Sequence, residues 1–202
     1  NVCPISIMDI VNHEENSIYH ILKELPEDIR QAGRSTVKSF DVKSRFVHFE
    51  YFRLTKRHKG LGKKGDLVGL EVNMRPSGGF SPDMMNFAHS TDVYKIWADM
   101  IAYGRSTVTA GEDAFCAFAG LRDTKSYAMT HEEILDKYGE AIRMVDRLPE
   151  TLADAMGNRM YLAVFDTEEK MQAFYRDVLV EAKQPQTRVR PSRIPKKRPL
   201  PA

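Results

Sequence analysis

The chain has 202 residues, of which 42% are hydrophobic, and a formal net charge of +2. This length suffices for one large domain or two small ones with a buried core. No run of about eighteen apolar residues occurs, and the first residues lack the basic flank, apolar stretch and cleavage site of a signal peptide. We therefore expect a cytoplasmic protein without a membrane partner.

The positive charge is concentrated at the C-terminal end. Residues 183–202 contain seven Lys or Arg and no acidic residue, so residues 1–182 carry −5, the difference between +2 and +7. The Pro- and Arg-rich segment 184–202 offers almost nothing to bury, which is typical of an extended tail. Cys3 and Cys116 lie far apart in no metal-like spacing, so we expect two buried thiols in a reducing compartment.

The first quarter of the chain predicts two strands and a helix. The apolar run Ile5–Ile10 resembles a strand, and Ser17–Leu25 is apolar enough to be a second one. Pro26 occupies the position of a first helical residue, and apolar residues then recur at three- and four-residue steps as far as Phe40. Gly33 lies on this apolar stripe, which indicates close packing against a sheet.

Two extended runs, Phe46–Leu54 and Leu67–Met74, are separated by a charged, glycine-containing segment typical of a hairpin loop. Ser90, Thr91 and Asp92 provide capping chemistry for the helix that follows and ends at Gly104. We expect its inward face to consist of Val93, Ile96, Trp97, Met100 and Ile101.

A second section begins near Thr107 and predicts a compact α+β unit without a catalytic constellation. Thr130 and Glu133 match the capping box of a short helix that ends at Gly139. The other expected elements are strands at Phe115–Leu121, Ala141–Leu148 and Arg159–Phe165, a helical turn at Glu150–Met156 and a closing helix at Glu168–Lys183.

The two runs of the hairpin carry unusual polar residues. With a period of two, one face of the second strand is apolar and predicts core: Val68, Leu70, Val72 and Met74. The other face carries Gly69, Glu71, Asn73 and Arg75. In the first strand, one face consists of Phe46, His48, Glu50, Phe52 and Leu54. Glu50 is therefore a carboxylate among apolar neighbours, a poor place for an unpaired charge.

A turn about Gly60 and Leu61 places Glu50 opposite Glu71 and His48 opposite Asn73. Directly opposed carboxylates repel unless a proton or a cation lies between them. Mg²⁺ meets this need, because it accepts one or two carboxylates, an amide oxygen, waters and phosphates. A solvated polar face remains the alternative, and a bulge could separate the two acids.

The segments FVHFEYF and GLEVNMRPSGG, joined by a hairpin and followed by a helix, resemble the C-terminal subdomain of ATP-grasp enzymes such as biotin carboxylase and carbamoyl phosphate synthetase. The resemblance covers roughly residues 1–104. It implies that Glu50, Glu71 and Asn73 bind magnesium and, through it, ATP, and that Arg75 closes the E-x-N-x-R signature. The expected fold is α+β: an ATP-grasp C-terminal lobe in residues 1–106, a small α+β subdomain in 107–183 and the tail in 184–202.

The activity that the resemblance implies is ADP-forming ligation, in which a carboxylate activated as an acyl-phosphate is attacked by an amine. Arg75 is the expected catalytic and substrate-binding residue, because its planar fork can hold a phosphate or carboxylate; a salt bridge is its alternative. Ser77, Gly78 and Gly79 are candidates for substrate contact, or form a plain turn into the next helix. We interpret His48 as a core residue and the basic loop as a solvated hairpin tip.

One part of the ATP-grasp pattern is absent from this sequence. The first lobe, with its glycine-rich phosphate loop and lysine, is not present. We therefore expect an inactive fragment that is completed by an N-terminal lobe from the same polypeptide or a second chain. The expected substrates are a small carboxylate and an amine; a homo-oligomer is left open and no nucleic acid is expected. The alternative is an ATP-grasp-like binding or regulatory module without catalysis.

Overall fold

The structure, a computed structural model, describes residues 1–182. It is a mixed α+β protein with two antiparallel sheets. The larger sheet has four strands in the order β1-β4-β6-β5: β1 (Ser17–Ile21), β4 (Phe115–Leu121), β6 (Arg159–Phe165) and β5 (Ile142–Arg147). The smaller sheet is the hairpin of β2 (His48–Arg53) and β3 (Leu67–Asn73).

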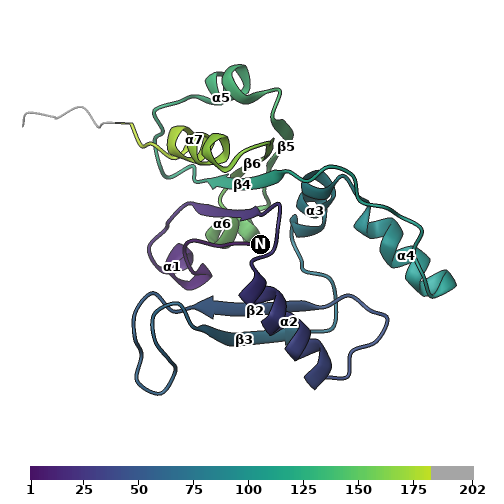
Figure 1. The fold of residues 1–202 in the computed structure, drawn as a ribbon. Helices are drawn as coiled ribbons and strands as arrows, with labels where there is room; N and C mark the ends of the chain where they lie inside the picture. Colours follow the sequence, from purple (N-terminus) through teal and green to yellow (C-terminus); the bar gives the residue numbers. More distant parts are fainter. Residues whose placement is uncertain (183–202) are drawn as a thin grey trace, which may run out of the picture.

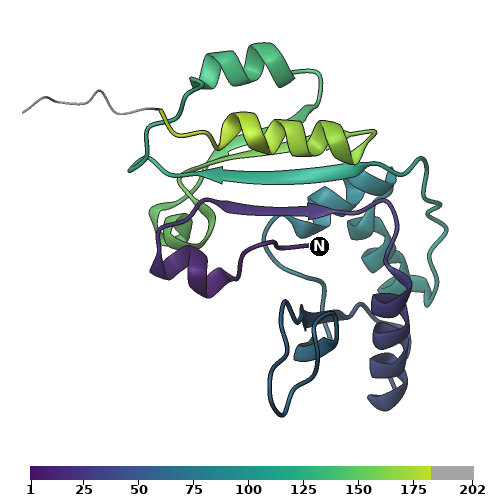
Figure 2. The ribbon, with the colours of Figure 1, turned by 60° about the vertical axis from the view of Figure 1, so that its left-hand side comes forward.

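Seven helices connect or flank these strands within residues 1–182. They are α1 (Ile7–Asn12), α2 (Glu27–Ser39), α3 (Ser81–His89), α4 (Val93–Tyr103), α5 (His131–Tyr138), α6 (Glu150–Met156) and α7 (Glu168–Val178). Helices α5 and α7 lie on one side of the four-stranded sheet, while the hairpin and α2 lie on the other side, farther away (Figures 1 and 2). None of these helices has the length and apolar composition needed to cross a lipid bilayer.

The four-stranded sheet is buried on both faces. On β4, Ala117 and Ala119 belong to a core that includes Phe174 of α7 and Ile134 of α5. Their neighbours alternate to the other face, where Phe118 packs in a second core with residues of α3. The other buried residues of this second core are Ile21, Met84, Ala88, Cys116, Leu148, Met160 and Leu162. Helices from both halves of the chain therefore stabilise one sheet.

This sheet crosses the boundary expected at residue 106. Strand β1 comes from residues 1–106, yet it pairs antiparallel with β4, with Ser17 opposite Gly120 and Ile21 opposite Cys116. The division into domains 1–106 and 107–183 stays a prediction, and the tail 184–202 lies outside the described residues.

Several local predictions are confirmed. Strands β4 and β6 and helix α6 have the expected bounds, and Thr130 and Glu133 form the capping box of α5. Asp92 caps α4 by accepting a hydrogen bond from the Lys95 backbone N–H, and Gly104 ends that helix in the left-handed conformation. These signals depend on neighbours in sequence, which is why they could be predicted.

Other predictions are wrong. The run Ile5–Ile10 lies mostly in helix α1, because the Ser6 hydroxyl accepts a hydrogen bond from the Asp9 backbone N–H and caps a helix there. Gly33 is not a close-packing site, since a Cβ built on it meets no atom within 4 Å. Cys116 is buried as expected, whereas Cys3 is exposed; both thiols are free.

The expected inward face of α4 is only partly buried: Val93 is buried, and Ile96 and Met100 are half-buried. Trp97 is 38% exposed and Ile101 71% exposed, whereas Asp99, which accepts hydrogen bonds from Lys95, is only 7% exposed. The side-chain hydrogen bond from Lys95 lowers the pKa of the Asp99 carboxyl group. The apolar stripe exists as predicted but is covered only in part: Val93 is buried and the Trp97 ring packs against Phe46 with 5.6 Å between centroids. The rest of α4 projects from the body (Figure 1).

Arg122 is a buried charged residue that joins three elements. Its Nε donates to the Glu15 carbonyl at 2.8 Å and its Nη2 donates to the carbonyls of Asp154 at 2.6 Å and Ile10 at 3.3 Å. Its Nη1 donates to the Ala153 carbonyl at 3.2 Å. The side chain therefore ties α1 and α6 to the end of β4.

We expect Arg122→Ala to lower the free energy of unfolding by about 3 kcal/mol or more, because each buried carbonyl left without a donor costs about 1–3 kcal/mol. Arg147→Ala is the matched control. It removes an exposed pair with Asp123 and should cost less than about 1 kcal/mol. Urea unfolding of both variants measures the difference, and equal losses would contradict the assigned role of Arg122.

Candidate metal-binding hairpin

The β2–β3 register brings the predicted polar residues together. His48 lies opposite Asn73 and Glu50 opposite Glu71, so the predicted pairing is confirmed. The only irregularity of the ladder falls after Glu50, where Tyr51 pairs with Gly69 and Leu70 becomes an extra residue on β3. Because directly opposed residues share a face, the four polar side chains lie on one face of the hairpin.

The bulge changes the composition of the two faces. Val68 pairs with Phe52 and therefore moves to the face of Glu50, whereas Val72 pairs with Phe49 on the opposite face. The expected core face of β3 is also wrong in its burial: Leu70 is 55% exposed and Val72 38% exposed. The reason is that the two-stranded sheet stands apart from the larger sheet and no described element covers this surface fully.

Helix α2 lies against the face that carries Tyr51. The Tyr51 hydroxyl is 2.7 Å from the Thr36 hydroxyl, and Arg53 Nη1 donates to the Asp28 carboxylate at 2.6 Å. This exposed pair lowers the pKa of the Asp28 carboxyl group through the hydrogen bond from Arg53. Since Tyr51 and Arg53 alternate with Glu50 along β2, α2 leaves the face of the two glutamates open.

The polar face holds negative charge with little compensation. Glu50 Oε1 lies 3.3 Å from His48 Nε2, and its side chain is 40% exposed. Within residues 1–182, neither Glu50 nor Glu71 forms an ion pair with a Lys or Arg. Two buried nitrogen atoms beside them, Nδ1 of His48 and Nδ2 of Asn73, have no hydrogen-bond partner. Unsatisfied buried polar atoms of this kind call for an explanation, of which a missing ion or ligand is one.

The predicted substrate-binding residues, Arg75, Ser77, Gly78 and Gly79, lie outside the paired part of the hairpin. Arg75 lies beyond the end of β3, is exposed, and donates through Nη1 to the Pro76 carbonyl at 2.9 Å. Within the part of the chain that the structure describes, Arg75 has no acidic partner, so the salt-bridge alternative is not realised there. Ser77 is half-buried, while Gly78 and Gly79 are exposed in the turn that leads into α3.

Cys3 is a neighbour of the hairpin that no sequence signal indicated. Although the residue is exposed, enough protein surrounds its thiol that desolvation raises the pKa of the thiol, and the negative charge of Glu50 raises it further. The two residues are 47 positions apart, so local patterning could not reveal this electrostatic effect. His48, which we interpreted as a core residue, is half-buried and contacts Glu50.

No three His, Cys, Asp or Glu side chains within residues 1–182 converge closely enough to form a metal site by themselves. A cation on the hairpin therefore needs the amide of Asn73 and oxygen atoms from water or a phosphate in addition to the two carboxylates. Mg²⁺ has this preference, since it usually keeps several waters and takes one or two carboxylates together with substrate phosphates.

Comparison with known proteins gives little to identify the chain. No family model matches it, and no curated protein matches its sequence. Among solved structures, phosphoribosylglycinamide synthetase from Anaerococcus prevotii is similar, with 11% sequence identity and a TM-score of 0.49. The match covers 80% of this chain and 44% of that chain, so this chain spans less than half the length of the synthetase.

The effect of the Glu50 charge on the pKa of the Cys3 thiol gives a test of the polar face. We expect Glu50→Gln to lower the pKa of the Cys3 thiol, because the negative charge that disfavours the thiolate is removed. Alkylation by iodoacetamide at pH 8 should become faster by less than about tenfold, the change that one pKa unit produces. Cys116 does not interfere, because it is buried and its pKa is raised to about 12. An unchanged or slower rate would show that Glu50 does not act on Cys3.

Proposed function

We propose that this chain carries the metal-binding hairpin of an ATP-dependent, ADP-forming ligase of the ATP-grasp type. The observation that supports this most is the pairing of Glu50 with Glu71 on the same face as His48 and Asn73. Neither carboxylate has a Lys or Arg partner among the described residues, and only His48 lies beside Glu50. Two opposed carboxylates destabilise a hairpin unless a cation offsets their repulsion. The same residues match the acid and amide positions of the ATP-grasp signature described above.

The donor set fits a magnesium ion. Glu50 and Glu71 supply carboxylate oxygens, and Asn73 supplies an amide whose Nδ2 finds no acceptor. The nitrogen and oxygen of an Asn side chain are assigned from their hydrogen-bond partners, so a rotation that exchanges them places an oxygen where a cation needs one. His48 lies beside Glu50 and holds the carboxylate in position.

Each residue then has a defined task. The bound Mg²⁺ supplies electrostatic stabilisation for charge that develops on ATP phosphates. Glu50, Glu71 and Asn73 hold that ion on the hairpin. Arg75 has an exposed guanidinium without an acidic partner in residues 1–182, which suits a phosphate or a carboxylate of the substrate. The turn of Ser77, Gly78 and Gly79 allows the substrate to approach the backbone.

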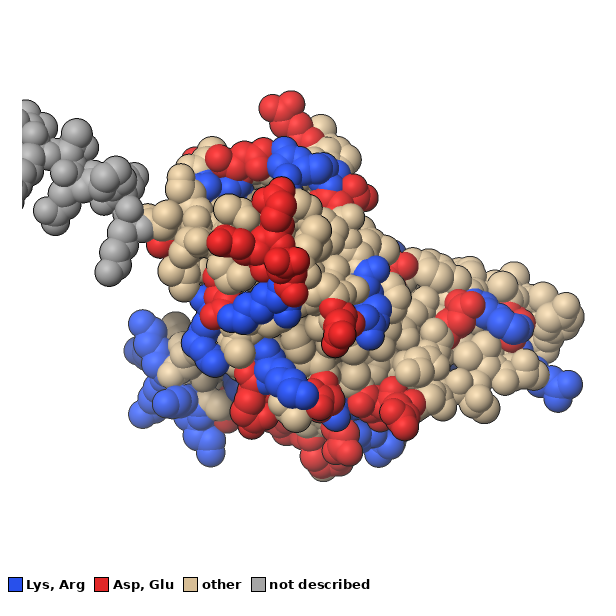
Figure 3. Space-filling view, turned by 90° about the horizontal axis from the view of Figure 1, so that it is seen from above, with Lys and Arg blue, Asp and Glu red and all other residues tan. Residues whose placement is uncertain are grey.

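The proposed ligase needs a second lobe, and the exposed apolar surface supports one. Leu70 and Val72 on β3 and Trp97 and Ile101 on α4 are large apolar side chains, yet all are more than a third exposed. The projecting part of the molecule at the right of Figure 3 carries few charged side chains. An N-terminal lobe, from the same polypeptide or another chain, would cover this surface; a carboxylate and an amine are the proposed substrates.

Binding of Mn²⁺, which takes the same ligands and is visible by electron paramagnetic resonance, tests the metal site. We expect the double variant Glu50→Gln and Glu71→Gln to weaken Mn²⁺ binding more than about tenfold, since losing even an outer-shell partner of a metal costs that much. The matched control replaces Glu140 and Glu169, two exposed acids on other elements, with Gln. Equal affinity in the wild-type chain and both double variants would exclude this hairpin as the metal site.

Catalysis by the isolated chain is a separate question. We expect no acceptor-dependent formation of ADP in a single-turnover assay of this chain, because the proposed second lobe is absent from it. In the complete ligase, Glu71→Gln should abolish turnover while the fold is retained. Unchanged activity of that variant would favour the alternative, a binding or regulatory module without catalysis.

A further inference from the structure

The loop at the end of the hairpin, residues 56–66, is a second feature of interest. It carries five exposed basic side chains: Lys56, Arg57, Lys59, Lys63 and Lys64. None of the five forms an ion pair with any residue in 1–182. Figure 3 shows Lys and Arg side chains crowded at lower left, on the side from which this loop protrudes in Figure 1. The loop is therefore strongly positive, although residues 1–182 carry a net negative charge.

The loop is an ordered double turn. The His58 backbone N–H donates to the Gly62 carbonyl at 2.9 Å, and the Lys63 backbone N–H donates to the Asp66 carboxylate at 2.9 Å. A Cβ at Gly62, whose φ is +154°, would lie 2.7 Å from Asp66 Oδ2, so a side chain there would strain the backbone and displace the Asp66 carboxylate. Asp66 is the only acid in this loop, and its carboxylate is used to hold the backbone, so the lysines keep their charge available for a ligand.

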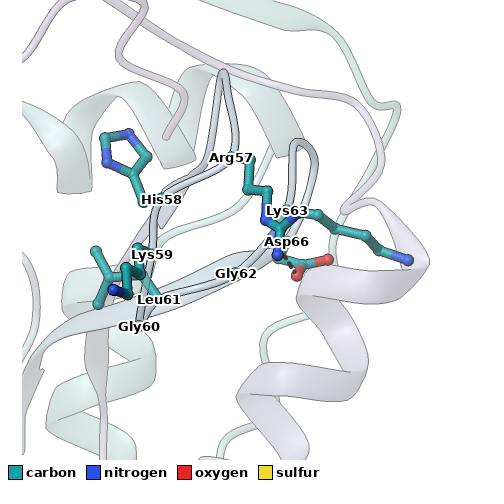
Figure 4. Close-up of a pocket in the computed structure, with 8 residues that line it drawn as sticks. All are labelled: Arg57, His58, Lys59, Gly60, Leu61, Gly62, Lys63 and Asp66. Atoms are coloured by element: carbon teal, nitrogen blue, oxygen red, sulfur yellow. Dashed lines mark hydrogen bonds between the residues drawn. The ribbon is translucent and has the colours of Figure 1, made fainter.

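The basic side chains leave the loop on two sides. Arg57 and Lys63 lie beside Asp66 on one side of the narrow loop, and His58 and Lys59 point to the other (Figure 4). These residues line an open hollow together with Gly60, Leu61 and Gly62. An open hollow cannot enclose a small anion, so the arrangement favours a ligand with several phosphates spread over a distance.

We propose that this loop binds double-stranded DNA by entering its major groove as a two-stranded ribbon. The major groove of B-form DNA has the width to admit such a ribbon, and phosphates line both of its edges. Cations on both sides of the loop are placed to reach both edges. Contacts of Lys and Arg with phosphates carry no sequence information, so we propose that this binding depends mainly on the DNA backbone. From the sequence, these cations could neutralise phosphates or form a solvated hairpin tip, and the sequence does not show on which sides of the loop they project.

The test is binding of labelled duplex DNA to the full chain across a salt series. The loop variant replaces Lys59, Lys63 and Lys64 with Gln. It should bind at least about tenfold more weakly and lower the slope of log affinity against log salt by about 3, since each of the three lysines neutralises one phosphate. Duplex RNA should bind more weakly than DNA to the wild-type chain, because its major groove is too narrow for a ribbon.

Two controls carry the same change of charge. One replaces Lys38, Lys43 and Lys170, exposed residues on other elements, with Gln. The other replaces Arg188, Arg190 and Arg193, from the basic C-terminal segment, with Gln. Both should bind DNA within about threefold of the wild-type affinity. The proposal would be overturned if only the C-terminal variant lost DNA affinity, or if all three variants lost it equally. It would also be overturned if the wild-type chain bound DNA, ATP, polyglutamate and anionic vesicles with equal affinity. The double variant of Glu50 and Glu71 should bind DNA normally, which separates this inference from the proposed metal site.

Discussion

The repulsion between Glu50 and Glu71 is the constraint on which the functional account depends. Their backbones are fixed opposite each other by the ladder of β2 and β3, and no described Lys or Arg approaches either carboxylate. Such a pair weakens the hairpin that presents it, unless a cation or shared proton intervenes. The unsatisfied nitrogen atoms of His48 and Asn73 beside the pair strengthen the view that this face is built for a ligand.

The two sheets differ in the interactions that stabilise them. The four-stranded sheet is buried on both faces and tied at its end by Arg122, so it forms a stable body. The hairpin has two unpaired edges and relies on α2, mainly through Tyr51 with Thr36 and Arg53 with Asp28. A lone two-stranded hairpin is only marginally stable in water. An ion bound on the polar face, which α2 leaves open, would therefore stabilise this hairpin.

The sequence was informative wherever the deciding interaction is local. In an antiparallel hairpin the numbers of two paired residues add to the same total along the ladder, so a turn at Gly60 and Leu61 predicted the pairing of Glu50 with Glu71. The cap of α5 was predicted from Thr130 and Glu133. Patterning also showed which residues of α4 share a face, but burial depends on whether another element covers that face. Trp97 is therefore exposed despite its place in an apolar stripe. The bulge at Leu70 and the approach of Cys3 to Glu50 arise from tertiary structure and left no local signal.

The central claim is that one divalent ion is shared by Glu50, Glu71 and Asn73. Paramagnetic broadening of backbone amide signals by trace Mn²⁺, followed by nuclear magnetic resonance on the wild-type chain, tests it most directly. The account predicts that the amides of 48–50 and 71–73 broaden first and together, and that excess Mg²⁺ restores them. Broadening that begins at other acidic residues, such as Glu14 and Glu15 after α1, while the hairpin signals stay sharp would contradict it.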